Sequence, residues 1–61
     1  MFKEYDVVYA NEDINELIKK NTLGVVLMTF EGEPSYYEVE FVDENKSTIN
    51  VLTVSQDKLR Y

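Results

Sequence analysis

The alternation of apolar and polar residues predicts a chain built mostly of short β-strands. The clearest signal is the segment 36–42 (YYEVEFV), in which Tyr37, Val39 and Phe41 alternate with two glutamates. Successive side chains of a strand point to opposite faces, so these three apolar residues share one face. We therefore predict a strand with one face in the core, including Tyr37, and the other face in solvent.

Other segments have the β-branched and aromatic composition that strands favour. They are residues 6–10, 48–54 and, as a short last strand, 59–61. The run 23–30 (LGVVLMTF) is apolar throughout and too short for most helices, which predicts a strand buried over much of its length. Within it, Gly24 predicts a bulge or a close approach of the backbone to a neighbour. Turns are expected at 31–35 and 43–46.

The connection between the first two strands has a different pattern. Ile14, Leu17 and Ile18 are spaced as residues on one face of a helix are. Asn21 follows, and asparagine tolerates the left-handed conformation that ends a helical turn. We therefore predict a short helical excursion over 13–20, one or two turns long.

These elements predict a mainly β fold, a small SH3-like barrel of four or five antiparallel strands with a short helical excursion after the first strand. The expected order is a strand, a long connection, a meander of three strands, a 3₁₀ turn at 55–58 and a last strand. Curling the sheet into a barrel removes exposed edges. The alternative is an open antiparallel sheet covered by a helix over 13–20. In either case residues 1–61 form one domain, and the predicted core is Val7, Val26, Leu27, Val39, Phe41, Val51, Leu52 and Leu59.

Composition restricts the chemistry of the 61-residue chain. It contains no Cys, His or Trp, which excludes disulfides, structural zinc sites, and nucleophilic catalysis by Cys or by a Ser–His pair. We therefore expect no enzymatic activity, no metal and no cofactor. No apolar run approaches the roughly 20 residues of a membrane span, and the start has no signal-peptide character. A cytoplasmic protein with no membrane contact is expected.

Charge narrows the class of partner. Twelve acidic residues against six basic ones give a formal net charge of −6, so the chain repels phosphate backbones and nucleic acid is not an expected partner. Six of the acids lie within 31–44, a stretch without Lys or Arg: Glu31, Glu33, Glu38, Glu40, Asp43 and Glu44. Three interpretations stay open for them: a solvated strand face, a binding face for a basic protein, or a catalytic or calcium site. The calcium-loop motif Asp-x-Asp-x-Asp-Gly is missing.

A candidate contact surface follows from the strand alternation. Tyr36 is expected on the solvent face of segment 36–42 with Glu38 and Glu40, and tyrosine is favoured at interfaces. The acids of the two flanking turns are expected to reinforce these charges over a single end or face. The predicted partner-binding residues are Tyr36, Glu38, Glu40, Asp43 and Glu44. Grooves for proline-rich peptides usually contain a Trp, so that activity is not expected.

The chain also resembles a known family. The run YEVEFVDEN at 37–45, Thr48, VLTV at 51–54 and Leu59 carry most of the resemblance, together with DVV at 6–8 and LGVV at 23–26. They are similar to the small bacterial family called domain of unknown function 4926. Members look like SH3-like barrels and are often encoded beside toxin-like proteins, which implies an antitoxin or immunity role. The resemblance implies no catalytic residues for this chain. Asn21 and Lys46 stand where the family usually has Gly.

The resulting functional hypothesis is a small acidic, non-catalytic protein-binding module, an antitoxin or immunity-type partner of a basic, toxin-like protein. Acidic inhibitors associate quickly with basic targets through electrostatic steering. Two alternatives remain. The first is a structural homo-oligomer with a self-complementary apolar and tyrosine surface. The second is an SH3-like accessory domain associated with nucleic acid or the ribosome.

Overall fold

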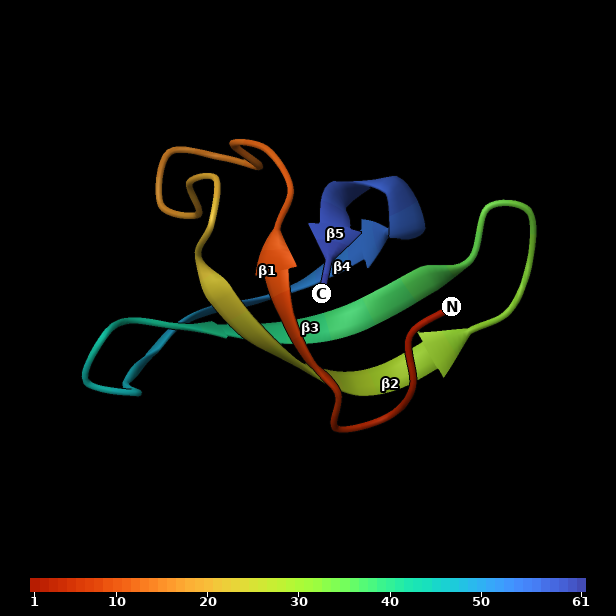
Figure 1. The fold of residues 1–61 in the computed structure, drawn as a ribbon, viewed down its shortest axis with the longest axis horizontal. Coiled ribbons are helices and arrows are strands. Elements are labelled where there is room, and N and C mark those ends of the chain that lie inside the picture. The colour runs from red at the N-terminus through yellow and green to blue at the C-terminus, as the bar shows by residue number, and fades with distance from the viewer.

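The five strands of the protein form one antiparallel sheet in the order β4-β3-β2-β1-β5 (Figure 1). The computed structural model describes all residues, 1–61. Its elements are β1 (Val7–Ala10), β2 (Leu23–Phe30), β3 (Tyr36–Val42), β4 (Thr48–Ser55), the 3₁₀ turn η1 (Gln56–Lys58) and β5 (Leu59–Arg60). The predicted mainly β architecture is confirmed, and each predicted strand lies within a residue of its expected bounds. No helix has the length and hydrophobicity needed to cross a membrane.

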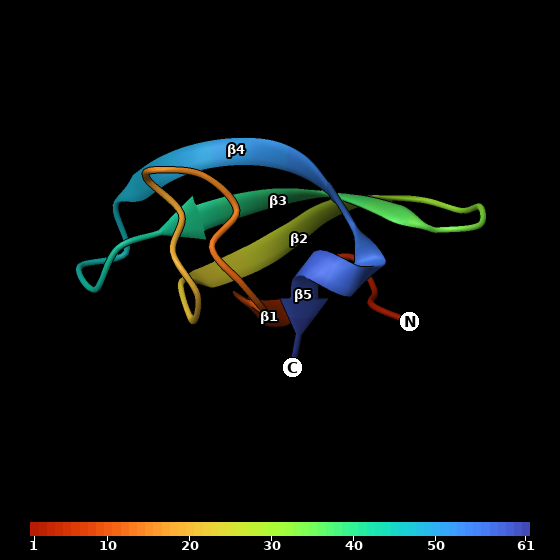
Figure 2. The same cartoon turned by 90° about the horizontal axis from the view of Figure 1, so that it is seen from above.

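The sheet curls into a half-barrel. The meander β2–β3–β4 arches across the molecule, and η1 turns the chain back so that β5 pairs with β1 (Figure 2). At its other side, β4 pairs with β3 alone and ends the sheet. The concave side of this curled sheet holds the core.

The predicted helix over 13–20 is wrong, because the connection 11–22, here called the excursion, contains no helix. The amide N–H of Ile14 donates to the carbonyl of Ile18 (2.8 Å), the reverse of the helical direction. Asn15 Oδ1 accepts from the amides of Leu17 and Ile18, both at 2.8 Å. An asparagine side chain that bonds nearby amides competes with helical hydrogen bonding. Ile18 is fully buried while Leu17 is 61% exposed.

The core confirms half of the residues expected there. Its ten-residue cluster contains Val26, Val39, Phe41 and Leu59 as predicted, and also Phe2, Val8, Ala10, Ile18, Tyr37 and Val54. Tyr37 is buried, as its alternation with Val39 and Phe41 predicted.

Two predicted core residues are wrong, since Val7 is 49% exposed and Val51 is 42% exposed. Both follow from strand parity. On β1, Val8 points inward, so the adjacent Val7 points outward. On β4, Val54 points inward, so Val51, three residues before it, points outward. Leu27 and Leu52 are half-buried. Leu27 lies at a register shift between Val26 and Met28, and Leu52 packs against the cluster.

Gly24 is a point of close approach, as expected. A Cβ atom there would lie 2.5 Å from Val39 Cγ1 and 3.0 Å from Phe41 Cδ1. Any side chain at this position would collide with β3 in the middle of the core. The bulge in β2 lies further along, between Val26 and Met28.

The first and last residues of the chain pack together. The ring of Phe2 packs edge-on against Tyr37 and Tyr61, with centroids 5.4 and 4.8 Å apart. Tyr61 Oη donates to Asp6 Oδ2 at 2.8 Å. The Lys3 amide, which also donates to Asp6, and then the Tyr61 hydroxyl lower the pKa of the Asp6 carboxyl. Phe2 therefore belongs to the core although it precedes the first strand.

Candidate functional site

The candidate site is the convex side of the meander, built by cross-strand neighbours. Residues paired directly across two strands carry their side chains on the same face. Glu38 of β3 lies between Met28 of β2 and Thr53 of β4. Tyr36 in the same way lies between Phe30 and Ser55. We call this surface the outer face, and its members are Val25, Met28, Phe30, Tyr36, Glu38, Glu40, Val51, Thr53 and Ser55.

Three predicted contact residues share this surface. Tyr36, Glu38 and Glu40 follow one another along the solvent side of β3, the central strand of the meander. Glu40 lies between Val25 and Val51, and its carboxylate accepts a hydrogen bond from the Thr48 hydroxyl. The alternation of the strand was therefore sufficient to predict which face these side chains occupy.

The outer face also contains exposed apolar side chains that sequence reasoning missed. Met28, Phe30 and Tyr36 are between 44% and 49% exposed. The apolar run of β2 predicted burial over much of its length, but the core packs against only one face of this strand. The signal that could have revealed them is pairing with the polar side of β3, which only the register supplies.

The charges of the outer face are of one sign. Glu38 and Glu40 are the only charged residues in β2, β3 and β4. The one ion pair of the protein joins Lys58 to Glu12 elsewhere, with Nζ and Oε2 3.0 Å apart. The arrangement is thus two half-buried carboxylates set among apolar side chains, without a basic neighbour on the same strands.

The sequence led us to expect the acids of the two turns at a single end or face with these glutamates. In the structure they lie apart. Glu31 and Glu33 lie in the β2–β3 loop, while Asp43 and Glu44 lie in the β3–β4 turn, at the opposite end of β3 (Figure 1). The seven-residue strand β3 separates the two pairs of acids by about 20 Å. This distance is well beyond the screening length of about 10 Å at 0.1 M salt. Consecutive turns of a meander always lie at opposite ends.

Asp43 has a structural role in its turn. Its Oδ1 accepts hydrogen bonds from the amides of Asn45 (2.8 Å) and Ser47 (3.0 Å). Lys46 between them has a φ of 66°, and Asn21 at the end of the excursion has a φ of 76°. The expected left-handed conformation of Asn21 is confirmed. Lys46 adopts the same conformation, although its long side chain is not of the Asn or Asp type that favours it.

A shallow hollow of about 830 Å³ lies at one end of the sheet, away from the outer face. The side chains of Met1, Phe2 and Leu59 form its apolar part, and Glu33 and Asp57 contribute carboxylates. It is open to solvent, and it lies between the β2–β3 loop, the N-terminal segment and η1.

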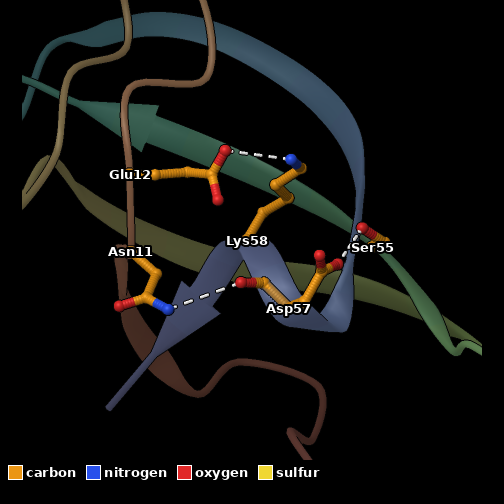
Figure 3. A network of polar contacts seen from close by, with 5 residues as sticks. All are labelled: Asn11, Glu12, Ser55, Asp57 and Lys58. Atoms are coloured by element: carbon orange, nitrogen blue, oxygen red, sulfur yellow. Dashed lines mark hydrogen bonds and ion pairs between the residues drawn. The ribbon is translucent and has the colours of Figure 1, made fainter.

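A polar network beside this hollow joins the excursion to η1 (Figure 3). Lys58 bonds to Glu12, and the Asn11 side-chain amide donates to the carbonyl of Asp57 at 3.4 Å. The Ser55 hydroxyl donates to the Asp57 carboxylate and lowers the pKa of that carboxyl. The Glu12 carboxylate raises the pKa of the Lys58 ammonium. Each of these groups has a partner within the fold, which makes the network structural.

Two further observations limit what the surfaces can do chemically. No three carboxylates lie close enough together to hold a metal ion. Every buried polar side-chain atom has a hydrogen-bond partner, so no orphaned group points into a pocket. The outer face remains as the surface on which carboxylates and exposed apolar side chains lie together.

Comparison with known proteins identifies the family. No curated protein and no solved structure matches the chain. A family model described as a domain of unknown function (DUF4926) matches residues 4–61. Since that match covers nearly the whole chain and agrees with the resemblance found in the strand residues, the protein belongs to the DUF4926 family.

Proposed function

We propose that the protein is a small non-catalytic binding module whose outer face takes a basic protein partner. The observation that carries this proposal is the setting of Glu38 and Glu40 among the exposed side chains of Met28, Phe30 and Tyr36. Aromatic residues and methionine are enriched in protein interfaces. Covering this surface with an apolar partner would leave two carboxylates buried without counter-charge, at a high desolvation cost. A partner with Lys or Arg at matching positions avoids that cost.

The electrostatics also favour a different protein over a second copy on this surface. A two-fold pairing of outer faces would bring Glu38 and Glu40 of one copy against the same residues of the other. Nucleic acid is disfavoured for the same reason, since its phosphates are also negative. The net charge of −6 would steer a basic protein towards the module and speed its association.

The antitoxin or immunity type is the specific form of this proposal. A toxin-like protein with a basic surface would be held inactive by a small acidic partner in the cytoplasm of the cell that makes both. We further assign the half-barrel to the SH3-like barrels. The order of its elements supports this: a first strand, a long excursion, a three-strand meander, a 3₁₀ turn and a last strand beside the first.

The test measures association kinetics with the product of the neighbouring gene. Substituting Glu38→Lys together with Glu40→Lys should slow association by roughly tenfold or more at low salt. Added salt should remove most of the difference, because it screens steering over about 10 Å at 0.1 M. The fold should persist, because both side chains lie on the solvent side of β3, outside the core cluster.

A matched control separates the outer face from net charge. Glu31→Lys with Glu33→Lys makes the same change in net charge, but in the β2–β3 loop at the end of the sheet. The control should slow association much less than the outer-face pair does. Equal effects of the two pairs, or unchanged kinetics in the folded outer-face variant, would place the binding site elsewhere.

A further inference from the structure

The outer edge of β4 is an unpaired strand edge. β4 ends the sheet and pairs with β3 alone. None of the backbone hydrogen bonds outside the ladders involves residues 48–55. The strand reads TINVLTVS, without charge and without proline. Natural proteins usually protect such an edge with Lys, Pro or a bulge. β4 has a register shift near its start, opposite Phe41 and Val42, and one outward amide, that of Val51, bonded to the Asn50 side chain.

The backbone groups that face this edge can be identified. The amide of Val51 bonds to the side-chain oxygen of Asn50 at 2.9 Å, so it points away from β3. Backbone groups alternate in direction along an antiparallel strand, so Thr53 and Ser55 also present theirs to the free edge. Thr53 is exposed, and it lies midway between Val51 and Ser55.

We infer that a second copy of this chain pairs with the free edge, antiparallel, about a two-fold axis at Thr53. In this register Thr53 of each copy exchanges both backbone hydrogen bonds with Thr53 of the other. Val51 then lies opposite Ser55 of the second copy, where its amide exchanges the Asn50 side-chain oxygen for the Ser55 carbonyl. Leu52 lies opposite Val54 of the second copy. A threonine pair directly opposite across two strands is favourable. The two half-barrels become one continuous ten-stranded assembly.

Charge identifies a second copy, rather than a basic segment, as the occupant. The edge strand has no carboxylate to attract a cation and no charge to repel its own copy. The nearest acids, Glu38 and Glu40, lie one strand further in. Three strand spacings therefore separate them from their counterparts, about 14 Å, which exceeds the screening length of about 8 Å at physiological salt. This pairing involves only the β4 members of the outer face and leaves its β2 and β3 members exposed, so the inference does not depend on the proposed partner.

The mass of the protein in solution tests the inference. In sedimentation velocity up to about 1 mM, the wild-type mass should rise from 7.2 kDa towards twice that value. Thr53→Lys should weaken dimerisation at least tenfold, because it adds a charge that meets its own copy at the two-fold axis. Thr53→Pro should do the same by removing the outward N–H, while the ladder with β3 is preserved. Circular dichroism checks that both variants fold.

The matched control is Thr29→Lys, since Thr29 is exposed on β2 and pairs with β3 rather than lying at the free edge. This variant should dimerise as the wild type does. Hydrogen exchange adds a local readout, in which the Thr53 amide should become slower as concentration rises.

Three results would overturn the inference. The first is a wild type that stays monomeric at about 1 mM. The second is a dimer that persists in both Thr53 variants. The third is a Thr53 amide that becomes protected only when the neighbouring gene's product is added, which would assign the edge to that protein.

Discussion

The meander β2–β3–β4 and the excursion 11–22 are ordered by different means. The meander consists of long strands joined by antiparallel ladders, with six paired positions between β2 and β3 and seven between β3 and β4, and one register shift in each ladder. The excursion has no regular element. One buried side chain, Ile18, anchors it, and bonds from side chains to backbone fix its path: Asn15 to Leu17 and Ile18, Asp13 to Lys20, and Thr22 to Lys19.

The difference explains where sequence patterns can be trusted. In the meander, apolar composition and backbone hydrogen bonding both favour strands, so the strands were predicted correctly, although the outward side of Val51 was not. In the excursion, the spacing of three apolar residues favoured a helix, while Asn15 favoured a closed loop. The loop forms because the asparagine oxygen satisfies two amides locally and allows Ile18 to enter the core, with Ile14 packed against it and Leu17 left exposed. A local polar group thus outweighed a hydrophobic spacing of only one turn.

The largest expected effect is in the meander. Phe41→Ala removes a fully buried ring and should cost roughly 3–5 kcal/mol, which approaches the whole stability of so small a core. Urea denaturation should show that the cooperative transition is lost or nearly lost. Val51→Ala, on the outer face of the same sheet, should cost about 0.5 kcal/mol or less. Similar costs at the two positions would mean that the faces are not divided as described.

The second prediction distinguishes the observed excursion from a helix. Ile18→Ala should cost about 2–4 kcal/mol, since its side chain is fully buried. Leu17→Ala should cost no more than about 0.5 kcal/mol, since that side chain is 61% exposed. A helix packed through both residues would give comparable losses. Equilibrium unfolding of the two variants side by side decides between these structures.

The third prediction concerns the bonds made by Asn15. Replacing it with Ala leaves the amides of Leu17 and Ile18 without their acceptor and should cost about 1 kcal/mol. Asn15→Asp retains an acceptor oxygen and serves as the control. Hydrogen exchange at Leu17 and Ile18 should accelerate in the Ala variant while exchange in β3 changes little. Uniform acceleration throughout the sheet would argue against a separately ordered excursion.

The fourth prediction compares the left-handed residues of the two regions. Lys46→Gly in the β3–β4 turn should stabilise the protein by about 0.5 kcal/mol, because a left-handed non-glycine residue is strained. Asn21→Gly at the end of the excursion should give no gain. Asparagine tolerates this conformation, and Asn21 Oδ1 accepts a hydrogen bond from Arg60 Nη2 at 2.6 Å. Thermal unfolding should order the variants in this way, and the reverse order would contradict it.

The smallest expected effect is the pH dependence of the contact between the excursion and η1. Glu12 raises the pKa of Lys58 above 10.5, so the stabilisation is present below pH 10.5 and is lost as the pH rises through the folded-state value. The melting temperature of the wild type should slightly exceed that of Glu12→Gln at neutral pH. The gap should close above pH 10.5. A gap that widens with rising pH would contradict the sign of this linkage.

The candidate site was predictable in part. The alternation along β3 placed Tyr36, Glu38 and Glu40 on one solvent face, where they lie. The apolar neighbours Met28 and Phe30 were not predictable, because an unbroken apolar run does not reveal which of its residues point outward. The bulge after Val26 resets that parity, and its position depends on pairing with β3 rather than on β2 itself.

The sequence by itself determined the strands, their turns, the polar side of β3, and the need for small or left-handed residues at Gly24 and Asn21. These features depend on neighbours along the chain, and periodicity or backbone sterics encodes them directly. The tertiary structure decided the parity of Val7 and Val51, the loop around Ile18, the separation of the turn acids and the free edge of β4. Each of these depends on which strands lie side by side, and residues distant in the chain fix that through their packing.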